Sequence, residues 1–499
     1  MSQNSARLAL RSRVPFVLVE APAGCGKTHE AAATAVDLAT ELPDYQEVLL
    51  LAHTNAAVQE FRTRIRSRRA RVRALTLDAF ALELVSPYAK PLCLPTPLRV
   101  GEHEGTAFSI LAPKLAELLR RSPSLSRALA LHYPVIVLDE HQDARSDQHE
   151  AIINLASAGG VRLRIFGDPM QAIYEFGKVS PLDWSGIKAK ADINDDLDEP
   201  RRWDHNRELG EWILEARRTL ERGRPIPMRS APQCVNLVQI QGLDDVPNPN
   251  SRGVVPAVVA PLCTILNSLQ GSLVVLARSN AHVFGLRLAT KGRLRINEGV
   301  DLEPAYNLLS EAETSVGNPL GLAKAVTELI SKTSVGLTTK IRDDLSRSLF
   351  PDRIDFGRRK VVRPLLEYLA PFYDTPDVPT VCCVVRRIYQ RPPDWLRIQL
   401  PESFHVLGQL SFPAGEDPKI ELDRIVRYRK EAAFVPFRCA STIHKAKGRE
   451  FDHVVIALCC RSPFPDTIEA RRLLYVALSR ARLSIHILVS ARKPSPLVG

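Results

Sequence analysis

Short apolar runs alternate with amphipathic helical patterns along the first 190 residues. Each run is followed by a polar or Gly-containing turn and then by a helical pattern; the runs are Phe16–Glu20, Val48–Ala52, Val135–Leu138 and Arg164–Phe166. Alternation of this kind predicts a parallel sheet with helices on both faces. The first part of the chain is therefore expected to be an α/β core.

A second set of apolar runs follows, and a long insert divides it. The runs are Val235–Ile240, Leu273–Ala277, Val454–Leu458 and Ile485–Val489. The insert, from about Arg287 to Ala433, is Pro-rich and mostly helical in pattern. A smaller insert, from about Ser86 to Ala128, interrupts the first set with the helical run Ala107–Leu119. The pattern predicts two α/β cores with parallel sheets, each carrying a mainly helical insertion.

The expected domain boundaries follow from these interruptions. We expect a first core over 1–85 and 129–190, a small helical insertion over 86–128, a second core over 191–286 and 434–499, and a reduced insertion domain over 287–433.

Composition and hydropathy favour a globular protein away from membranes. The 499 residues are 45% hydrophobic and 25% charged, which excludes wholesale disorder. No uninterrupted apolar run reaches the ~18 residues that span a bilayer, and the nearest, Val254–Leu269, contains two prolines and an asparagine. The apolar stretch Val14–Val19 runs directly into a phosphate-loop pattern, so it is interpreted as a strand and not as a secretory signal. We expect a cytoplasmic protein with no membrane partner.

Charge and cysteine content narrow the expected partners. The net charge of +11 suits a partner that carries phosphates, although an Arg-rich overall composition accounts for it equally well. The nine cysteines are odd in number and form no C-x-x-C pattern, which argues against a disulfide framework and against a zinc or iron–sulfur cluster.

A phosphate-binding loop follows the first strand. The segment reads Ala21-Pro22-Ala23-Gly24-Cys25-Gly26-Lys27-Thr28 and opens a helical pattern at 30–38. Glycines at these positions let backbone N–H groups wrap phosphates at a helix N-terminus. Lys27 is expected to reach the β- and γ-phosphates and Thr28 to hold Mg²⁺. This loop predicts a nucleoside triphosphate site, but it does not distinguish kinases, GTPases and motors.

An acidic motif after the strand Val135–Leu138 indicates hydrolysis. It reads Asp139-Glu140-His141-Gln142-Asp143. A carboxylate at the end of a buried strand can lie beside the phosphate loop and bind Mg²⁺, which is the role expected of Asp139. The neighbouring Glu140 can polarise the attacking water, so we expect hydrolysis and not transfer to a second substrate.

At this point the sequence resembles superfamily 1 DNA helicases of the UvrD/Rep/PcrA type. The resemblance begins with the A-x-x-G-x-G-K-T loop and the D-E-x-Q-D run and continues in the family's order through six further segments: 51–57 (LAHTNAA), 167–176 (GDPMQAIYEF), 197–202 (LDEPRR), 274–280 (VVLARSN), 442–451 (TIHKAKGREF) and 471–481 (RRLLYVALSRA). It implies two RecA-like P-loop cores, and it extends from residue 16 to residue 490 outside the two inserts.

The resemblance implies roles around ATP and Mg²⁺. Gln171 would sense the γ-phosphate from the first core, while Arg202 and Arg480 would reach it from the second. Glu450 matches the family's ribose-binding glutamate. The catalytic set is then Lys27, Asp139, Glu140, Gln171, Arg202 and Arg480. The ATP-binding set adds Ala21, Pro22, Ala23, Gly24, Cys25, Gly26, Thr28, His29, Arg201 and Glu450, with Thr28 and Asp139 as the magnesium ligands.

The resemblance also implies contacts with single-stranded DNA. Tyr174 and Phe176 match positions where the family stacks bases. Positions that line the DNA groove or couple it to the nucleotide site are Thr54, Asn55, Thr76, His444 and Lys447. The partner is expected to be single-stranded DNA or a tailed duplex.

Two departures from the family pattern bear on activity. The family's N-Y-R becomes Pro200-Arg201-Arg202, so the aromatic side chain that stacks on adenine is missing. Either Arg201 stacks by its planar guanidinium group or adenine selectivity is relaxed. Both inserts are shorter than in the large family members, which puts processive strand separation in doubt.

Two functions are therefore expected from the sequence. The first is an ATP-dependent translocase or helicase on single-stranded DNA, with 3′→5′ polarity as in the resembled family. The alternative is a DNA- or nucleotide-sensing ATPase subunit that regulates a partner nuclease, because the compact length and trimmed inserts resemble the helicase-like subunit of the Gabija anti-phage system. A catalytically dead nucleic-acid-binding scaffold is disfavoured, because the expected catalytic residues are all present.

Overall fold

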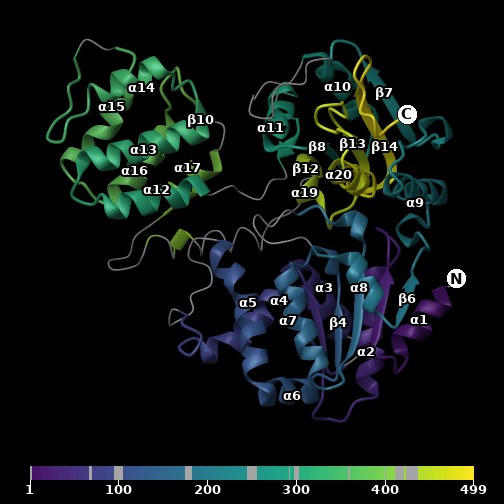
Figure 1. The fold of residues 1–499 in the computed structure, drawn as a ribbon. Helices are drawn as coiled ribbons and strands as arrows, with labels where there is room; N and C mark the ends of the chain where they lie inside the picture. The colour runs from purple at the N-terminus through teal and green to yellow at the C-terminus, as the bar shows by residue number, and fades with distance from the viewer. Residues whose placement is uncertain are drawn as a thin grey trace. The chain divides into compact units, whose positions relative to one another are not determined.

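The chain folds into two units. The computed structural model describes residues 3–66, 70–94, 105–174, 182–243, 256–290, 293–296, 303–357, 360–398, 401–410, 418, 421–422 and 437–499. The first unit comprises Met1–Ile296 and Phe437–Gly499, and the second comprises Asn297–Pro436. The first unit contains two six-stranded sheets (Figure 1).

The first sheet is parallel throughout, with strand order β3-β2-β4-β5-β1-β6. Its strands are β1 (Phe16–Glu20), β2 (Val48–Ala52), β3 (Val72–Thr76), β4 (Val135–Leu138), β5 (Arg162–Gly167) and β6 (Ile193–Asp196). Its helices are α1 (Gln3–Arg11), α2 (Lys27–Thr40), α3 (Asn55–Arg66), α4 (Leu77–Val85), α5 (Gly105–Arg121), α6 (Pro123–His132), α7 (Ser146–Ser157) and α8 (Trp184–Lys190).

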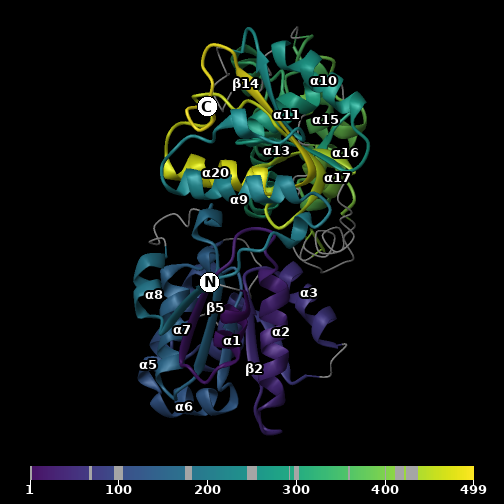
Figure 2. The same cartoon turned by 90° about the vertical axis from the view of Figure 1, so that its right-hand side faces the viewer.

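Hydrophobic cores cover both faces of this sheet. Every residue of β2 and β4 is buried, as expected for central parallel strands. Leu49 and Leu51 face a core with the helices α4, α5 and α7, whereas Val48 and Leu50 face a core with α1, α2 and α3. Figure 2 shows the two groups of helices on opposite faces of the sheet. The alternation of side chains along a strand therefore produces a three-layer core.

The second sheet is also parallel, with strand order β7-β14-β13-β8-β12-β9. Its strands are β7 (Val235–Ile240), β8 (Leu273–Ala277), β9 (Arg295–Ile296), β12 (Arg438–Thr442), β13 (Phe451–Ile456) and β14 (Ala481–Ser490). Its helices include α9 (Arg207–Glu221), α10 (Val259–Ser268), α11 (Asn280–Ala289), α19 (Ile443–Ala446) and α20 (Ile468–Leu478). The predicted fold class, α/β with two RecA-like parallel-sheet cores, is confirmed.

The second unit is mainly helical. Its described elements are α12 (Glu303–Thr314), α13 (Pro319–Thr333), α14 (Thr339–Ser346), α15 (Arg363–Leu369), α16 (Val378–Gln390), α17 (Pro401–Leu407) and the short antiparallel pair β10 (Ser334–Val335) and β11 (Arg397–Ile398). Apolar faces of these helices enclose a hydrophobic core of their own that includes Leu329, Phe372 and Phe404.

Two features of the first sheet differ from the expected domain limits. The strand β6 lies beyond residue 190, yet it pairs with β1 through the register Val17↔Ile193. The helix α5, expected in a separate insertion, contributes Leu111 and Leu115 to the core beneath the sheet. The strand β6 joins by backbone pairing, with Ile193 partly buried and Asp195 its only buried residue, whereas α5 buries apolar side chains. Interruptions of the sequence pattern do not reveal either arrangement. The other expected boundaries stay predictions.

None of the helices in the described parts of the chain is both long enough and apolar enough to cross a membrane.

Candidate nucleotide-binding site

The phosphate loop connects β1 to α2 at the carboxyl end of the first sheet. Gly24 and Gly26 have φ angles of 75° and 80°, in the left-handed region that favours glycine. A Cβ atom on Gly24 would also lie 2.6 Å from the indole ring of Trp203. The helix α2 begins at Lys27, directly after Gly26. The first N–H groups of this helix lack intrahelical acceptors, so the loop is built to bind anions.

Lys27, at the end of this loop, forms an ion pair with Glu140, which follows β4. Its Nζ atom lies 2.9 Å from Oε2 of Glu140, and the lysine side chain is only 6% exposed. Burial alone would lower the pKa of Lys27, but the carboxylates of Glu140 and Asp139 raise it above its usual value. Lys27 is therefore a positively charged group at the phosphate loop.

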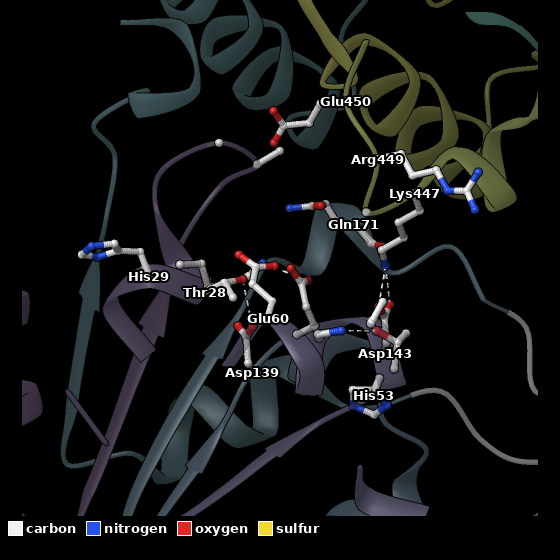
Figure 3. A pocket seen from close by; sticks show the side chains of 18 of the residues that line it. Thr28, His29, His53, Glu60, Asp139, Asp143, Gln171, Lys447, Arg449 and Glu450 are labelled. Carbon is white, nitrogen blue, oxygen red and sulfur yellow. Dashed lines mark hydrogen bonds and ion pairs between the residues drawn. The ribbon is translucent and has the colours of Figure 1, made fainter. Parts of the chain in front are cut away.

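Thr28 and Asp139 form a second contact beside it. The hydroxyl Oγ1 of Thr28 donates a hydrogen bond to Oδ2 of Asp139 at 3.0 Å, as Figure 3 shows. The other oxygen, Oδ1 of Asp139, is buried and has no hydrogen-bond partner. Burial and the charge of Glu140 raise the pKa of Asp139 to about 7. A buried carboxylate oxygen without a partner, beside a hydroxyl group, fits a divalent cation such as Mg²⁺.

Glu140 has an unusual backbone conformation. Its φ of 52° lies in the left-handed region, which non-glycine residues adopt rarely and mostly where the surroundings impose it. Its Oε2 atom accepts hydrogen bonds from Lys27 and from Nε2 of Gln142, the latter at 2.5 Å. Burial would raise the pKa of Glu140, but the ammonium groups of Lys27 and Lys447 lower it to about 2. Glu140 is therefore an ionised carboxylate turned toward the phosphate loop.

Arg202 reaches the same region from the segment η4 (Arg201–Trp203). Its backbone N–H donates to the carbonyl of Gly24 at 3.0 Å. Its guanidinium group lies 2.7 Å from the carboxylate of Glu450 and donates from Nη1 to the carbonyl of Ser479 at 2.6 Å. Arg202 thus joins the phosphate loop to residues of the second sheet.

Arg480 follows Ser479, the C-cap residue of α20, and is 2% exposed. Its Nη2 atom donates to Oγ of Ser479 at 2.7 Å, and its Nε atom donates to the carbonyl of Val476 at 3.0 Å. Burial and the neighbouring charge of Arg202 lower the pKa of Arg480 to about 10. This value still leaves the guanidinium group charged at neutral pH, and the arginine lines the same cavity as Lys27.

Lys447 connects α19 with the acidic motif of the first sheet. Its Nζ atom lies 2.6 Å from both carboxylate oxygens of Asp143 and 2.6 Å from the carbonyl of Gln171 (Figure 3). Burial, opposed by the charge of Lys447, raises the pKa of Asp143 to about 6. The same ammonium lies 4.9 Å from the ring centroid of Tyr174, which is 44% exposed. The lysine expected to contact DNA is thus engaged in an ion pair.

Most of the predicted site residues line a single cavity of about 860 Å³. From the predicted sets it includes Pro22, Ala23, Gly24, Gly26, Lys27, Thr28, His29, Thr54, Asp139, Glu140, Gln171, Tyr174, Arg201, Arg202, Lys447, Glu450 and Arg480. They come from both sheets of the first unit. The cavity has the size of small-molecule sites in proteins.

A few predicted residues lie elsewhere. Ala21 and Cys25 belong to the phosphate loop but are buried, and the backbone N–H of Cys25 donates to the carbonyl of Pro22 at 3.2 Å. Thr76 accepts a hydrogen bond from the N–H of Ala79 and so caps α4. His444 donates from Nε2 to the carbonyl of Ile173 at 3.1 Å, and Asn55 is exposed at the start of α3. Phe176 lies outside the described residues.

Several residues of the site were not predicted. Asp143, Asp168 and Tyr475 lie in the motif segments 139–143, 167–176 and 471–481, but the motif pattern predicted no role for them. What could have identified these three residues from the sequence is that each is a polar group at a fixed position within a motif. Arg217 lies outside the motifs, on α9, and donates two hydrogen bonds to Asp168. Only its contact in the folded chain reveals it.

The fold and the site together indicate the class of protein. Two parallel sheets of RecA type, with a phosphate loop, an adjoining pair of carboxylates and arginines beside the second sheet, are characteristic of P-loop ATPases. Family models match two stretches: an AAA domain over residues 3–177 and a UvrD-like helicase C-terminal domain over residues 437–488. No curated protein matches the chain.

These matches support a UvrD/Rep-like superfamily 1 helicase, and the predicted resemblance to that family is confirmed. An AAA domain of this type implies nucleotide binding by the first sheet.

Proposed function

We propose that this chain is an Mg²⁺-dependent ATPase that uses hydrolysis to move along single-stranded DNA in the 3′→5′ direction. The observation that carries the proposal is the cavity itself. It gathers the phosphate loop, Asp139 and Glu140 with Arg202 and Arg480 beside the second sheet. Charge that develops on a γ-phosphate in the transition state would meet cationic groups from both cores.

Each residue would then have a separate task. Thr28 and Asp139 would hold Mg²⁺, which when bound neutralises charge on the β- and γ-phosphates. Lys27 would leave Glu140 for the phosphates and so free that carboxylate to accept a proton from the attacking water. Arg202 would exchange its bond with Glu450 for a contact with the γ-phosphate, and Glu450 would then be free to bind the ribose.

Replacement of Glu140 tests the water-activating role. We expect Glu140→Gln to keep ATP affinity within about threefold of wild type while kcat falls by about 10²- to 10⁴-fold, because only the general base is lost. Measurement of nucleotide binding by fluorescence and of phosphate release gives both numbers. The matched control is Glu60→Gln, a cavity-lining carboxylate that pairs with Arg64 on α3. Turnover of the Glu140 variant near that of the control would contradict the assignment.

DNA binding is proposed at the open edge of the same cavity. Thr54 and Tyr174 line the cavity and are exposed, and Asn55 follows Thr54 at the start of α3. A ring with an exposed face suits base stacking. The net charge of +11 would supply phosphate contacts around it.

A salt titration tests this interface. Each lysine or arginine that neutralises a phosphate releases counterions, so log K for a single-stranded oligonucleotide should fall with log salt by about 0.7 per contact. We expect a clear negative slope between about 50 and 200 mM salt, measured by fluorescence anisotropy without nucleotide. A flat response would indicate that the basic excess is compositional.

Unwinding separates the motor from the alternative function. A translocating helicase should separate a duplex with a 3′ tail and leave a 5′-tailed duplex intact. A sensing ATPase that regulates a partner nuclease should show DNA-stimulated hydrolysis without strand separation. The ion pair of Lys447 with Asp143 is the observation in favour of this alternative, because it engages a residue expected to contact DNA. Assays with and without a candidate nuclease would decide between them.

A further inference from the structure

A buried carboxylate at the end of β5 collects hydrogen bonds from both cores. Asp168 is 0% exposed. Its Oδ1 atom accepts two hydrogen bonds from Arg217, from Nε at 3.1 Å and from Nη2 at 2.9 Å. Its Oδ2 atom accepts one hydrogen bond from Nε2 of Gln171 at 2.9 Å and one from the hydroxyl of Tyr475 at 3.1 Å. A buried charge of this kind is stable only when it is paired and hydrogen-bonded.

The donors come from elements that belong to different sheets. Gln171 ends the short helix η3 (Pro169–Gln171), which follows β5 of the first sheet. Arg217 lies on α9 and Tyr475 on α20; these two helices pack against each other, and both contact β14 of the second sheet. Asp168 is therefore a point at which the first core is bonded to two helices of the second.

Tyr475 makes one more contact, with the phosphate loop. Its hydroxyl oxygen accepts a hydrogen bond from the backbone N–H of Ala23 at 2.8 Å. The same hydroxyl donates to Asp168, so one oxygen joins the loop to the carboxylate that holds Gln171. Tyr475 is 0% exposed, and water therefore does not replace the bonds that its hydroxyl makes.

We infer that Tyr475 is a positioning residue for ATP hydrolysis, acting on the phosphate loop through Ala23 and on Gln171 through Asp168, with Arg217 holding Asp168 from the other side. The inference rests on the proposed ATPase function. The helix α20 that carries Tyr475 ends just before Arg480, whose Nε atom bonds to the carbonyl of Val476. One rigid helix thus holds both Arg480 and the groups of the first core that face the γ-phosphate.

The variant Tyr475→Phe tests this role with the smallest change. It keeps the ring and removes only the hydroxyl, which leaves the Ala23 amide and one Asp168 oxygen without this partner. We expect kcat for ATP to fall by about 10- to 100-fold, the size of effect that misplaced catalytic groups produce, with KM changed by less than about threefold. Steady-state ATPase kinetics on the full chain measure both.

The matched control is Tyr133→Phe. Tyr133 is 3% exposed and its hydroxyl accepts a hydrogen bond from Arg73 at 2.8 Å. It is thus a buried, hydrogen-bonded tyrosine that follows α6, packs in the core beside the first sheet and does not line the cavity. Removal of the Tyr133 hydroxyl should lower thermal stability about as much as Tyr475→Phe does. It should leave kcat for ATP within twofold of wild type. Equal loss of kcat in both variants would reduce the role of Tyr475 to general stability and overturn the inference.

A second variant acts on the other side of the carboxylate. Arg217→Lys retains a charge for Asp168 but loses the planar fork that donates twice to Oδ1. We expect kcat to fall by about tenfold, with Arg218→Lys, an exposed neighbour on α9, as the unaffected control. Wild-type kcat in both Tyr475→Phe and Arg217→Lys would overturn the inference. Absence of ATP hydrolysis in the wild-type chain would instead refute the proposed function.

Discussion

Replacement of Lys27 by alanine should lower kcat for ATP hydrolysis by at least about 100-fold. The ammonium group is buried at the start of α2 and is positively charged, because the carboxylates around it raise its pKa. Without it, charge on the β- and γ-phosphates would lack this counterion, and Glu140 would lose the partner 2.9 Å away. Phosphate release at saturating ATP, with melting curves to check folding, measures the effect.

The control for this prediction is Lys188→Ala. Lys188 also pairs with a carboxylate of the first core, Glu20 at 2.8 Å, but it lies on α8 and does not line the cavity. We expect this variant to hydrolyse ATP within twofold of wild type. If Lys27→Ala kept activity at that level, the cavity would not be the hydrolytic site.

Loss of either arginine beside the second sheet should also have a large effect on hydrolysis. We expect Arg202→Ala or Arg480→Ala to reduce DNA-stimulated ATP hydrolysis by about 10³-fold, the lower end for arginine fingers. Single-stranded DNA binding without nucleotide should stay within twofold of wild type, because neither guanidinium is expected to contact DNA. Parallel measurements of ATPase rate, with and without an oligonucleotide, and of DNA affinity give the comparison.

Two controls make this result interpretable. Arg480 is buried, so Arg480→Ala removes packing as well as the guanidinium group. Arg480→Lys, which keeps a long cationic side chain and loses only the planar guanidinium group, should be measured beside it. The second control is Arg207→Ala. Arg207 begins α9, shortly after Arg202, and its side chain is 81% exposed, so this variant should leave both ATP hydrolysis and DNA binding unchanged. Full stimulated turnover in Arg480→Ala would refute the two-core mechanism.

The central strands were predictable because burial on both faces imposes a continuous apolar run. The strands β1, β2 and β4 have the bounds that the pattern predicts. The edge strand β3 escaped prediction, because its charged Arg73 interrupts the run and only two of its five residues are buried. The strand β12 begins with Arg438 and contains small and polar residues, so it also lacked a clear pattern, although four of its residues are buried.

The site was predictable where its chemistry resides in contiguous segments. Lys27 and Thr28 follow a glycine pair, and Asp139 and Glu140 follow a buried strand, so residue type and spacing pointed to phosphate and Mg²⁺. The contacts of Lys447 were not predictable in the same way. Its expected DNA role came from a motif, whereas its ion pair with Asp143 joins residues 304 positions apart.

The sequence by itself determined that this protein has two α/β cores, a phosphate loop and an acidic motif after a buried strand, because these features follow from local periodicity and short-range spacing. Only the tertiary structure decided that β6 joins the first sheet, that Arg202 pairs with Glu450, and that Asp168 binds Arg217 and Tyr475. These pairings depend on which buried polar groups meet once the sheets are packed. A polar group that leaves water must find its partner in three dimensions, wherever that partner lies along the chain.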